Sequence, residues 1–384
     1  MPTELVGRAY FDWAAGAPLH PVAREAAERA LALGAGNPSS VHAEGRAARR
    51  LLEEARERVA RLAGCAPGDV IFTGSGSEAN AAAILGARVR PGRLLLGAIE
   101  HPSLRIAAES LRAGSAEVED LPVLPSGTID IERARAAIAE GPVTAVAVQL
   151  ANNETGAIQP IEALAAMARD VGAPLHCDAV QAAGKLDLAP WTARCASLAL
   201  SAHKLGGLAG AGALVLRAGE ERAALIPGHQ ERGRRGGTPA LVAIAAFGAA
   251  ADLAFRERES RASRLADRSS RLEEIVRAAG SEVRINASEV ERVPGIVSAT
   301  FPGVDGETLL VALDLAGIAC SHGAACSTGA MDPSHVLLAM GLSADGARST
   351  LRFSVGPDTS DDELALLRNA LPAALAQASV ARSR

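Results

Sequence analysis

A lysine and an acid that each follow a predicted strand are the first residues whose types and spacing suggest chemistry. Lys204 lies in a Gly-rich turn directly after the apolar run 197–201. A lysine at such a place can reach a bound cofactor and form a Schiff base with it, although a lysine in a loop is more often solvated. Asp178 follows the apolar run 174–177. It could keep a pyridine nitrogen protonated, or it could cap the next helix.

A Gly/Ser turn at 73–80 joins an apolar run to a helical pattern and suits a phosphate, because backbone N–H groups at a helix start attract anions. Gly74, Gly76 and Ala79 also match the dinucleotide fingerprint, and Glu100 lies about 20 residues further on, where the ribose-binding acid is expected. A third interpretation is a tight turn between strand and helix without a ligand. The residues alone leave these alternatives open.

The segment 320–329 places two cysteines among small residues. Cys326 can be a nucleophile if its thiol is exposed and ionised, and it can equally be a packed structural residue. A zinc site would use Cys320, His322 and Cys326, but the spacing matches no usual zinc signature and a fourth ligand is missing. No metal site is therefore expected.

The elements that must position these residues follow from the apolar pattern. Short, almost continuous apolar runs alternate with helical stretches such as 43–63, which ends at Gly64. This alternation predicts a parallel sheet with helices on both faces. The run 211–216 is expected to add an antiparallel strand. Beyond residue 255 a charged helix leads to a smaller α+β unit.

The composition is that of an ordinary globular protein. Hydrophobic residues make up 48% of the 384-residue chain, and charged residues 22%. The formal net charge of −5 gives no reason to expect nucleic acid or an anionic membrane as a partner. The longest apolar run, 240–255, is shorter than the roughly 20 residues that span a bilayer. Five scattered cysteines and an N-terminus without a signal-peptide pattern predict a cytoplasmic protein.

Taken together and in order, the motifs resemble the cysteine desulfurases of the iron–sulfur and nitrogen-fixation type, within the class V aminotransferase group of pyridoxal-phosphate (PLP) enzymes. The matching segments span nearly the whole chain and are 11–12, 37–42, 73–80, 100–101, 152–156 with 159–161, 176–181 with 184–185, 201–204, 230–233 with 235–238, 294–298, 325–327, 334–337 and 351–354. Two segments depart from the family pattern. Residues 207–210 replace the usual Gly-Pro-Lys-Gly, and residues 321–326 replace the usual Ser-Gly-Ser-Ala-Cys.

The resemblance implies the α/β fold of PLP-dependent transferases (fold type I). A large domain of residues 15–255 would carry a mostly parallel seven-stranded sheet. A smaller α+β domain of residues 1–14 and 256–384 would carry a mobile cysteine loop at about 320–332.

The resemblance also implies a role for each matching residue. Lys204 would hold PLP and move the Cα proton of the substrate, and His101 would stack on the ring and assist this transfer. The remaining cofactor contacts would come from Asp178 at the pyridine nitrogen, Gln181 at the phenolic oxygen, Asn153 beside the cofactor, and Gly76, Ser77, Ser201 and His203 at the phosphate, with Thr238 reaching in from a second subunit. The substrate would be bound by Arg352 and Asn153 at its carboxylate and by Asn37 at the entrance.

The implied activity is removal of sulfur from L-cysteine. Alanine and a persulfide on Cys326 would be the products, and the persulfide would pass its sulfur to an acceptor protein or scaffold. The expected assembly is a homodimer. A selenocysteine lyase or another class V PLP lyase or aminotransferase would share the cofactor residues, an NAD-linked dehydrogenase would use the turn at 74–79, and a silent scaffold homologue is the non-enzyme alternative.

Overall fold

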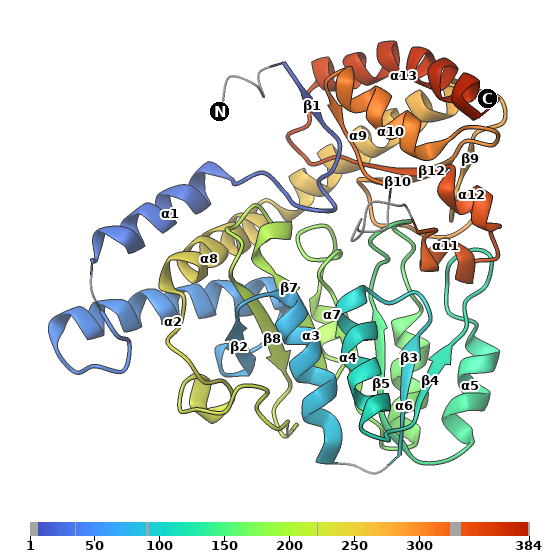
Figure 1. The fold of residues 1–384 in the computed structure, drawn as a ribbon. Helices are drawn as coiled ribbons and strands as arrows, with labels where there is room; N and C mark the ends of the chain where they lie inside the picture. Colours follow the sequence, from blue (N-terminus) through green and yellow to red (C-terminus); the bar gives the residue numbers. More distant parts are fainter. Residues whose placement is uncertain (1–6, 35, 90–91, 221, 323–331, 383–384) are drawn as a thin grey trace.

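The computed structural model describes residues 7–34, 36–89, 92–220, 222–322 and 332–382. A large unit carries a seven-stranded sheet, and a smaller unit carries a three-stranded sheet beside it (Figure 1). None of the helices in these ranges combines the length and the apolar character that crossing a membrane requires.

The large sheet is mostly parallel, as the alternating apolar pattern predicts. Its strands, in spatial order, are β2 (Val70–Thr73), β8 (Gly212–Leu216), β7 (Ser197–Ser201), β6 (Leu175–Asp178), β5 (Val143–Gln149), β3 (Arg93–Gly97) and β4 (Val118–Leu121). Strand β8 runs antiparallel to both β7 and β2, so the expected antiparallel strand is confirmed. Strand β4 was not identified from the sequence, because this edge strand reads Val-Glu-Asp-Leu and has no apolar run.

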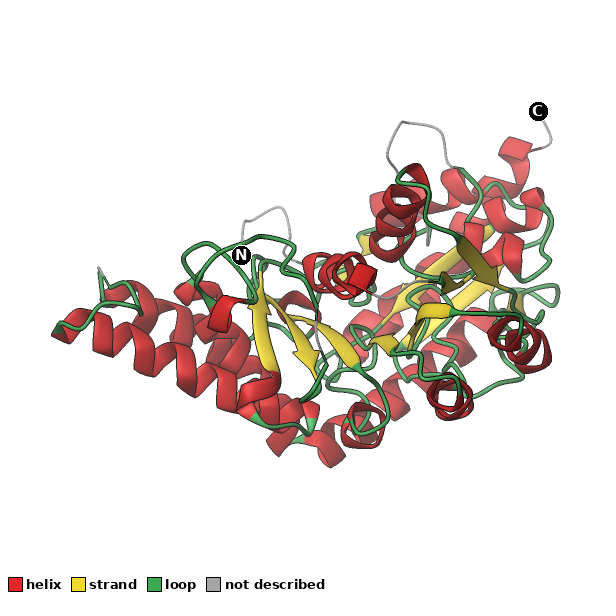
Figure 2. Ribbon diagram, turned by 90° about the horizontal axis from the view of Figure 1, so that it is seen from below, coloured by secondary structure: helices red, strands yellow, loops and turns green. Residues whose placement is uncertain are grey.

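Helices cover both faces of the large sheet (Figure 2). The helices of this unit are α1 (Pro21–Ala32), α2 (Ala43–Ala63), α3 (Gly76–Leu85), α4 (Pro102–Ala113), α5 (Ile131–Ala139), α6 (Ile161–Asp170), α7 (Ala189–Thr192) and α8 (Leu241–Arg256). One hydrophobic cluster joins α3 and α4 to β3 and β5. The largest cluster lies on the other face, where α2, α5, α6 and α8 pack.

Local sequence explains where these helices begin and end. Helix α2 ends at Gly64, whose φ of 70° lies in the left-handed region that glycine adopts without strain. Helix α3 begins after Ser75, whose side chain accepts a hydrogen bond from the N–H of Glu78. The run 240–255 forms the buried helix that its apolar pattern predicts.

The smaller unit has its own hydrophobic core. Its elements are β1 (Ala9–Tyr10), α9 (Arg258–Ala278), β9 (Arg284–Ile285), β10 (Ile296–Thr300), α10 (Gly306–Leu315), β11 (Ile318–Ala319), α11 (His335–Ala339), α12 (Ala344–Arg348), β12 (Thr350–Ser354) and α13 (Asp361–Arg382). Strand β10 pairs with both β9 and β12 in antiparallel fashion. The N-terminal strand β1 pairs with β11, so both ends of the chain contribute to this unit.

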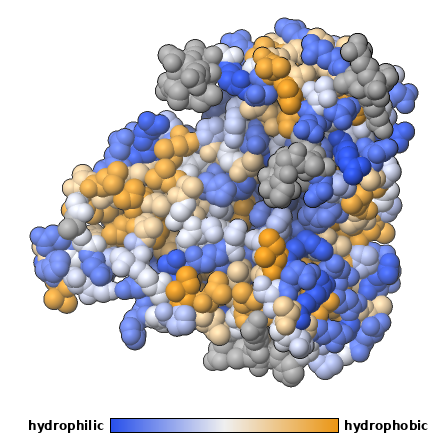
Figure 3. All heavy atoms as spheres, in the orientation of Figure 1, coloured by the Kyte–Doolittle hydropathy of each residue, from blue (hydrophilic) through white to orange (hydrophobic). Residues whose placement is uncertain are grey.

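The surface over α1 and the loop that follows it is rich in apolar side chains (Figure 3). Leu31 is 63% exposed and Val41 is 84% exposed. Isolated exposed apolar residues are common, whereas a group of them marks a contact surface.

Candidate active site

A cavity of about 340 Å³ lies at the carboxyl ends of the central parallel strands, which is where ligands bind in α/β sheets. Its walls come from the N-terminal segment, the large sheet and strand β12 of the smaller unit. The lining residues are Ala14, Ala15, Ser75, Gly76, Ser77, Asn80, His101, Ser103, Gln149, Ala151, Asn153, Asp178, Val180, Gln181, Ser201, His203, Lys204, Ser321 and Arg352.

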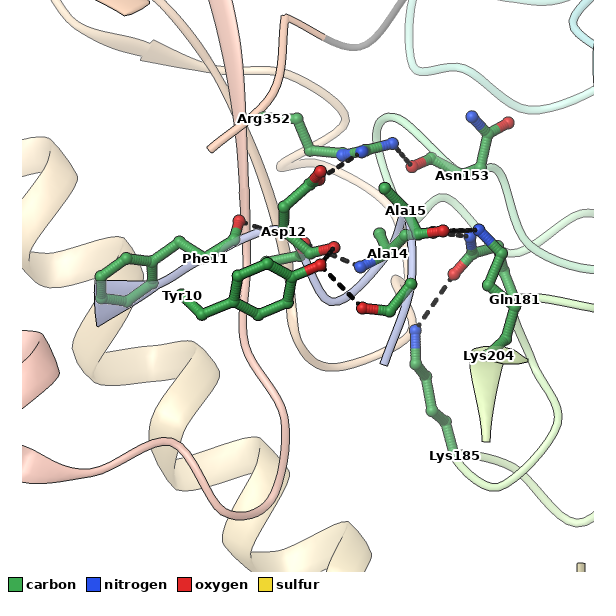
Figure 4. A network of polar contacts seen from close by, with 12 residues as sticks. Tyr10, Phe11, Asp12, Ala14, Ala15, Asn153, Gln181, Lys185, Lys204 and Arg352 are labelled. Carbon is green, nitrogen blue, oxygen red and sulfur yellow. Dashed lines mark hydrogen bonds and ion pairs between the residues drawn. The ribbon is translucent and has the colours of Figure 1, made fainter. Parts of the chain in front are cut away.

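Lys204 reaches this cavity from a short 3-10 helix, Ala202–Lys204, that directly follows β7. Its ammonium group donates hydrogen bonds to the carbonyl oxygens of Ala14 at 2.6 Å and Ala15 at 2.7 Å (Figure 4). Burial lowers its pKa to about 8, the charge of Arg352 adds to this effect, and Asp12 and Asp178 oppose it. The uncharged, nucleophilic form of Lys204 is therefore easier to reach near neutral pH than that of an ordinary lysine.

Asp178 ends strand β6 and lines the same cavity. Its Oδ1 accepts a hydrogen bond from the N–H of Val180 at 2.9 Å in a turn, and the next helix, α7, begins only at Ala189, so the helix-capping interpretation is wrong. Its Oδ2 accepts a hydrogen bond from the side-chain amide of Asn80 at 2.7 Å. A carboxylate held in this way can support a positive charge across the cavity.

The Gly/Ser turn forms one end of the cavity at the start of α3. A Cβ on Gly76 would lie 3.0 Å from a methyl group of Val180 and 3.1 Å from the Cβ of Ser201, so glycine keeps this end open. The hydroxyl group of Ser201 bonds to Nδ1 of His203 at 2.9 Å. Burial lowers the pKa of His203 to about 4, so this ring is neutral. Hydroxyl groups and the N-terminal N–H groups of α3 suit an anion here.

The turn does not belong to a dinucleotide-binding unit, so that interpretation is wrong. Strand β2, which precedes the turn, pairs only with the antiparallel strand β8 among the described strands, whereas the fingerprint requires parallel neighbours. The carboxyl group of Glu100 is fully buried. Burial raises its pKa well above the usual range, so it is no ribose-binding carboxylate.

His101 precedes α4 and caps it, with Nδ1 accepting a hydrogen bond from the N–H of Ser103 at 3.1 Å. Burial lowers the pKa of His101, and the nearby charges of Asp178 and Lys204 act in opposite directions on it. The ring is thus uncharged at neutral pH and available for proton transfer.

Arg352 brings a guanidinium group from β12 to the opposite side of the cavity. It is 4% exposed, so its ion pair does not lie on the surface. Nη2 lies 2.7 Å from Oδ1 of Asp12, and Nη1 donates to the carbonyl oxygen of Asn153 at 2.9 Å (Figure 4). Nε has no hydrogen-bond partner among the described residues. The guanidinium group lines the cavity and places a positive charge where a ligand carboxylate could pair with it.

Gln181 lies between two parts of this network. Its Nε2 donates to the carbonyl oxygen of Ala14 at 2.8 Å, and its Oε1 accepts from Nζ of Lys185 at 3.3 Å (Figure 4). These contacts fix the side-chain amide close to Lys204, which bonds to the same carbonyl oxygen.

Two expected site residues that the structure describes, Asn37 and Thr238, are not in the cavity wall. Asn37 is exposed and accepts a hydrogen bond from the N–H of Ser39 at 2.9 Å. Thr238 is exposed and lines a smaller pocket beside Phe72. Cys326 and most of the expected mobile loop lie outside the described residues.

Cys320 and His322 flank that segment. Burial raises the pKa of the Cys320 thiol, so this thiol is a poor nucleophile. Nε2 of His322 bonds to the carbonyl oxygen of Arg348 at 2.8 Å, which occupies one of its two possible ligand atoms.

Sequence reasoning gave no role to Asn80 or Ser103, both of which line the cavity. Asn80 is a polar residue in an apolar helix, and this contrast was the available signal. Ser103 follows His101 by two residues, where a hydroxyl group can bond to the capping ring. Asp12 was noted as part of a matching segment, but its ion pair with Arg352 could not be foreseen.

The residues of the cavity fit PLP. The start of α3 suits its phosphate, Asp178 suits its pyridine nitrogen, and Lys204 suits its aldehyde carbon. The fold and this donor set together define the PLP-dependent transferase class of proteins.

Comparisons with known proteins agree with this class. Residues 9–367 match the aminotransferase class V family. An IscS-like cysteine desulfurase of Mycobacterium tuberculosis is 38% identical over 381 residues, which cover 96% of this chain and 97% of the relative. The cysteine desulfurase NifS of Azotobacter vinelandii is 35% identical and covers 89% of this chain and 86% of the relative.

Solved structures give the same result. A NifS-like protein superposes with a TM-score of 0.87 at 27% identity, over 96% of this chain and 99% of the other. The structure of SspA in complex with cysteine superposes with a TM-score of 0.80 at 31% identity, over 92% and 100% of the two chains. The chain therefore belongs to the cysteine desulfurases of aminotransferase class V, a PLP-dependent group of sulfurtransferases.

Proposed function

We propose that the described cavity removes sulfur from L-cysteine with PLP held by Lys204. The observation that carries this proposal is the enclosed amine of Lys204, with a pKa of about 8, in the same cavity as the Asp178 carboxylate. The two groups end neighbouring parallel strands, β7 and β6. A reactive amine and an acid for the ring nitrogen are the two requirements of PLP chemistry.

The remaining cofactor contacts follow from the cavity wall. Gly76, Ser77, Ser201 and His203 would hold the phosphate, and Gln181 would contact the phenolic oxygen. His101 would stack on the ring. When bound, PLP supplies an electron sink that makes the Cα–H and Cβ–S bonds of the substrate easier to break.

The protein's own groups bind the substrate and move its protons. The guanidinium group of Arg352 would bind the substrate carboxylate, with Asn153 beside it and Asn37 at the entrance. Lys204 Nζ would take the Cα proton, because its lowered pKa makes it a base near neutral pH. His101 would assist this proton transfer.

The sulfur acceptor is Cys326 in this proposal. Its thiolate attacks the sulfur of L-cysteine, the Cβ–S bond breaks, and the new S–S bond leaves a persulfide on Cys326. Cysteine and a thiol thereby become alanine and a persulfide, so the step needs no external oxidant or reductant. The chemistry requires a soft nucleophile separate from the cofactor.

We also propose a homodimer in which Thr238 reaches the phosphate of the partner subunit. Support comes from the exposed position of Thr238 outside its own cavity and from the apolar surface over α1. A sulfur-acceptor protein or scaffold would take the persulfide sulfur. A cytoplasmic location, expected from the scattered cysteines, is part of the same proposal.

The proposed division of the chain is a large domain of residues 15–255 and a small domain of residues 1–14 and 256–384. Two separate hydrophobic clusters support it. One contains only residues between 23 and 254, and the other contains residues 9, 11 and 265–378.

Borohydride trapping tests the proposed function. Protein incubated with PLP should show a visible absorbance band, and reduction followed by peptide mass spectrometry should place the cofactor on Lys204. A separate sample of PLP-loaded protein that has not been treated with borohydride should convert L-cysteine to alanine and sulfide in equal amounts when a thiol reductant is present. A Lys204→Ala variant that still traps PLP at one defined lysine, or a wild-type protein that forms no alanine, would overturn the proposal. Selenocysteine supplied in parallel separates the desulfurase from a selenocysteine lyase.

A further inference from the structure

A buried asparagine stands at the centre of a hydrogen-bonded chain behind the active-site cavity. Asn80, on α3, is 1% exposed. Its Nδ2 donates to Oδ2 of Asp178 at 2.7 Å and to the hydroxyl oxygen of Ser103 at 3.0 Å. Its Oδ1 lies 2.9 Å from Nε2 of His176. Both polar atoms of the Asn80 side chain thus have hydrogen-bond partners. Because the side chain is buried, water does not readily replace these partners.

The direction of each hydrogen bond follows from the chemistry of the partners. An ionised carboxylate can only accept, so the NH₂ group of Asn80 must face Asp178 and its oxygen must face His176. His176 therefore carries its hydrogen on Nε2. Its Nδ1 accepts from the hydroxyl group of Ser197 at 2.9 Å. Burial lowers the pKa of His176 to about 3, so this ring stays neutral.

The second branch of the chain reaches His101. Because the Ser103 oxygen accepts from Asn80, its hydroxyl hydrogen is free to donate to Nδ1 of His101 at 2.8 Å. The backbone N–H of Ser103 points at the same ring nitrogen from 3.1 Å. A nitrogen that receives two donors cannot carry a hydrogen of its own, so a neutral His101 must carry its proton on Nε2.

We propose that Asn80 is a positioning residue that fixes the proton of His101 on Nε2. It also holds the Asp178 carboxylate in place through the hydrogen bond to Oδ2. The consequence for catalysis rests on the proposed function. Neutral His101 then presents its Nε2–H as a hydrogen-bond donor, and the role of base falls to Lys204. One asparagine therefore links the group at the cofactor nitrogen to the group that transfers protons.

The hydrogen positions of His101 can be measured without cofactor or activity. Long-range ¹H–¹⁵N spectra of cofactor-free protein with ¹⁵N-labelled histidine distinguish a protonated from an unprotonated ring nitrogen. The His101→Gln variant identifies the His101 signals by their loss. We expect Nδ1 unprotonated and Nε2 protonated in at least about a tenfold excess, the ratio that one net hydrogen bond supplies. A His101 that carries its proton on Nδ1, or on both nitrogens equally, overturns the proposal and leaves the proposed desulfurase activity untouched.

Two variants separate the branches of the chain. In Asn80→Asp, the introduced carboxylate can accept the Ser103 hydroxyl hydrogen, so Nδ1 of His101 loses a donor, and a second negative charge lies beside Asp178. We expect a mixed His101 tautomer, a higher His101 pKa in the NMR titration, and weaker PLP binding. Ser103→Ala removes only the His101 branch, so it should change the His101 signals and leave PLP affinity close to wild type.

Ser110→Ala is the matched control. Ser110 is an exposed serine on α4, the helix that also carries Ser103, and its hydroxyl group donates to the carbonyl oxygen of Ile106. This variant should leave the His101 signals unchanged. Thermal unfolding confirms that each variant is folded. If Asn80→Asp does not fold, the His101 tautomer of the wild-type protein and the His101 signals of Ser103→Ala still test the proposal. Wild-type His101 signals in both folded variants would show that Asn80 and Ser103 do not position this ring.

Discussion

The guanidinium group of Arg352 and the carboxylate of Asp12 form an ion pair beside the active-site cavity, with 2.7 Å between Nη2 and Oδ1. The Arg352 side chain is 5% exposed and that of Asp12 is 23% exposed. Asp12 occupies one edge of the guanidinium group and leaves Nε without a partner among the described residues. The pair therefore orients the guanidinium group in the wall of the cavity.

The first prediction concerns the guanidinium group of Arg352 as the partner of the substrate carboxylate. Arg352→Lys keeps the positive charge but removes the planar group, so the substrate carboxylate loses a charge-assisted hydrogen bond of about 1.5–3 kcal/mol. We expect kcat/KM for L-cysteine to fall about 10- to 100-fold, mainly through a higher KM. Initial-rate measurements of alanine formation test this. Arg348→Lys, at an exposed position four residues earlier, should behave as wild type, and an unchanged KM in Arg352→Lys contradicts the assignment.

The second prediction concerns pH. Lys204 has a pKa lowered from its ordinary value of 10.5 to about 8, chiefly by burial and next by the charge of Arg352. Because only the neutral amine attacks the cofactor, PLP should load faster as pH rises through about 8 and level off above it. Arg352→Gln removes a positive charge and should move the midpoint to higher pH. Asp12→Asn removes a negative charge and should move it to lower pH.

Stopped-flow absorbance of PLP mixed with cofactor-free protein gives these midpoints. The reaction of PLP with N-acetyl-lysine provides the baseline for an ordinary amine. Midpoints that coincide in the three proteins would show that these charges do not act on Lys204.

The third prediction separates two cysteines. Cys326→Ser should abolish persulfide formation and sulfide release, because none of the described thiols lines the cavity. Cys320→Ser should keep most activity, since burial raises the pKa of the Cys320 thiol and disfavours its reactive thiolate. Mass spectrometry after L-cysteine treatment without reductant locates the extra sulfur. An adduct on Cys320 alone, or full sulfide release by Cys326→Ser, argues for direct release of sulfur at the cofactor.

The fourth prediction concerns stability near the segment that carries Thr238. Glu231 forms a two-point ion pair with Arg56, at 2.7 and 2.8 Å, and both side chains are almost fully buried. Glu231→Gln removes the buried counter-ion of Arg56 and leaves only the half-exposed Glu53 beside it, which should lower the free energy of unfolding by about 3–5 kcal/mol. Urea unfolding measures this loss.

Glu53→Gln is the matched control for this prediction. Glu53 pairs with the same arginine, but its side chain is 51% exposed, so the loss should stay below about 1 kcal/mol. Equal losses in the two variants would show that burial does not set the strength of the pair.

Features governed by neighbouring residues could be predicted from the sequence. Gly64 ends α2 because only a residue at ease with positive φ closes a helix in this way, and Lys204 follows a strand because the apolar run before it is continuous. The place of Lys204 and Asp178 at one end of the sheet follows from the parallel arrangement. These features depend on local signals. The order of the motifs along the chain indicated the resemblance to the family.

Only the tertiary structure decided which distant residues meet. Asn80 and Asp178 are 98 positions apart, and Arg352 and Asp12 are 340 positions apart. Strand β8 lies between β2 and β7, and this arrangement excludes the dinucleotide interpretation. The edge strand β4 is polar, so the sequence has no apolar pattern from which it could be predicted. Periodicity and turn chemistry act over a few residues, whereas such contacts depend on how whole elements pack once the chain has closed on itself.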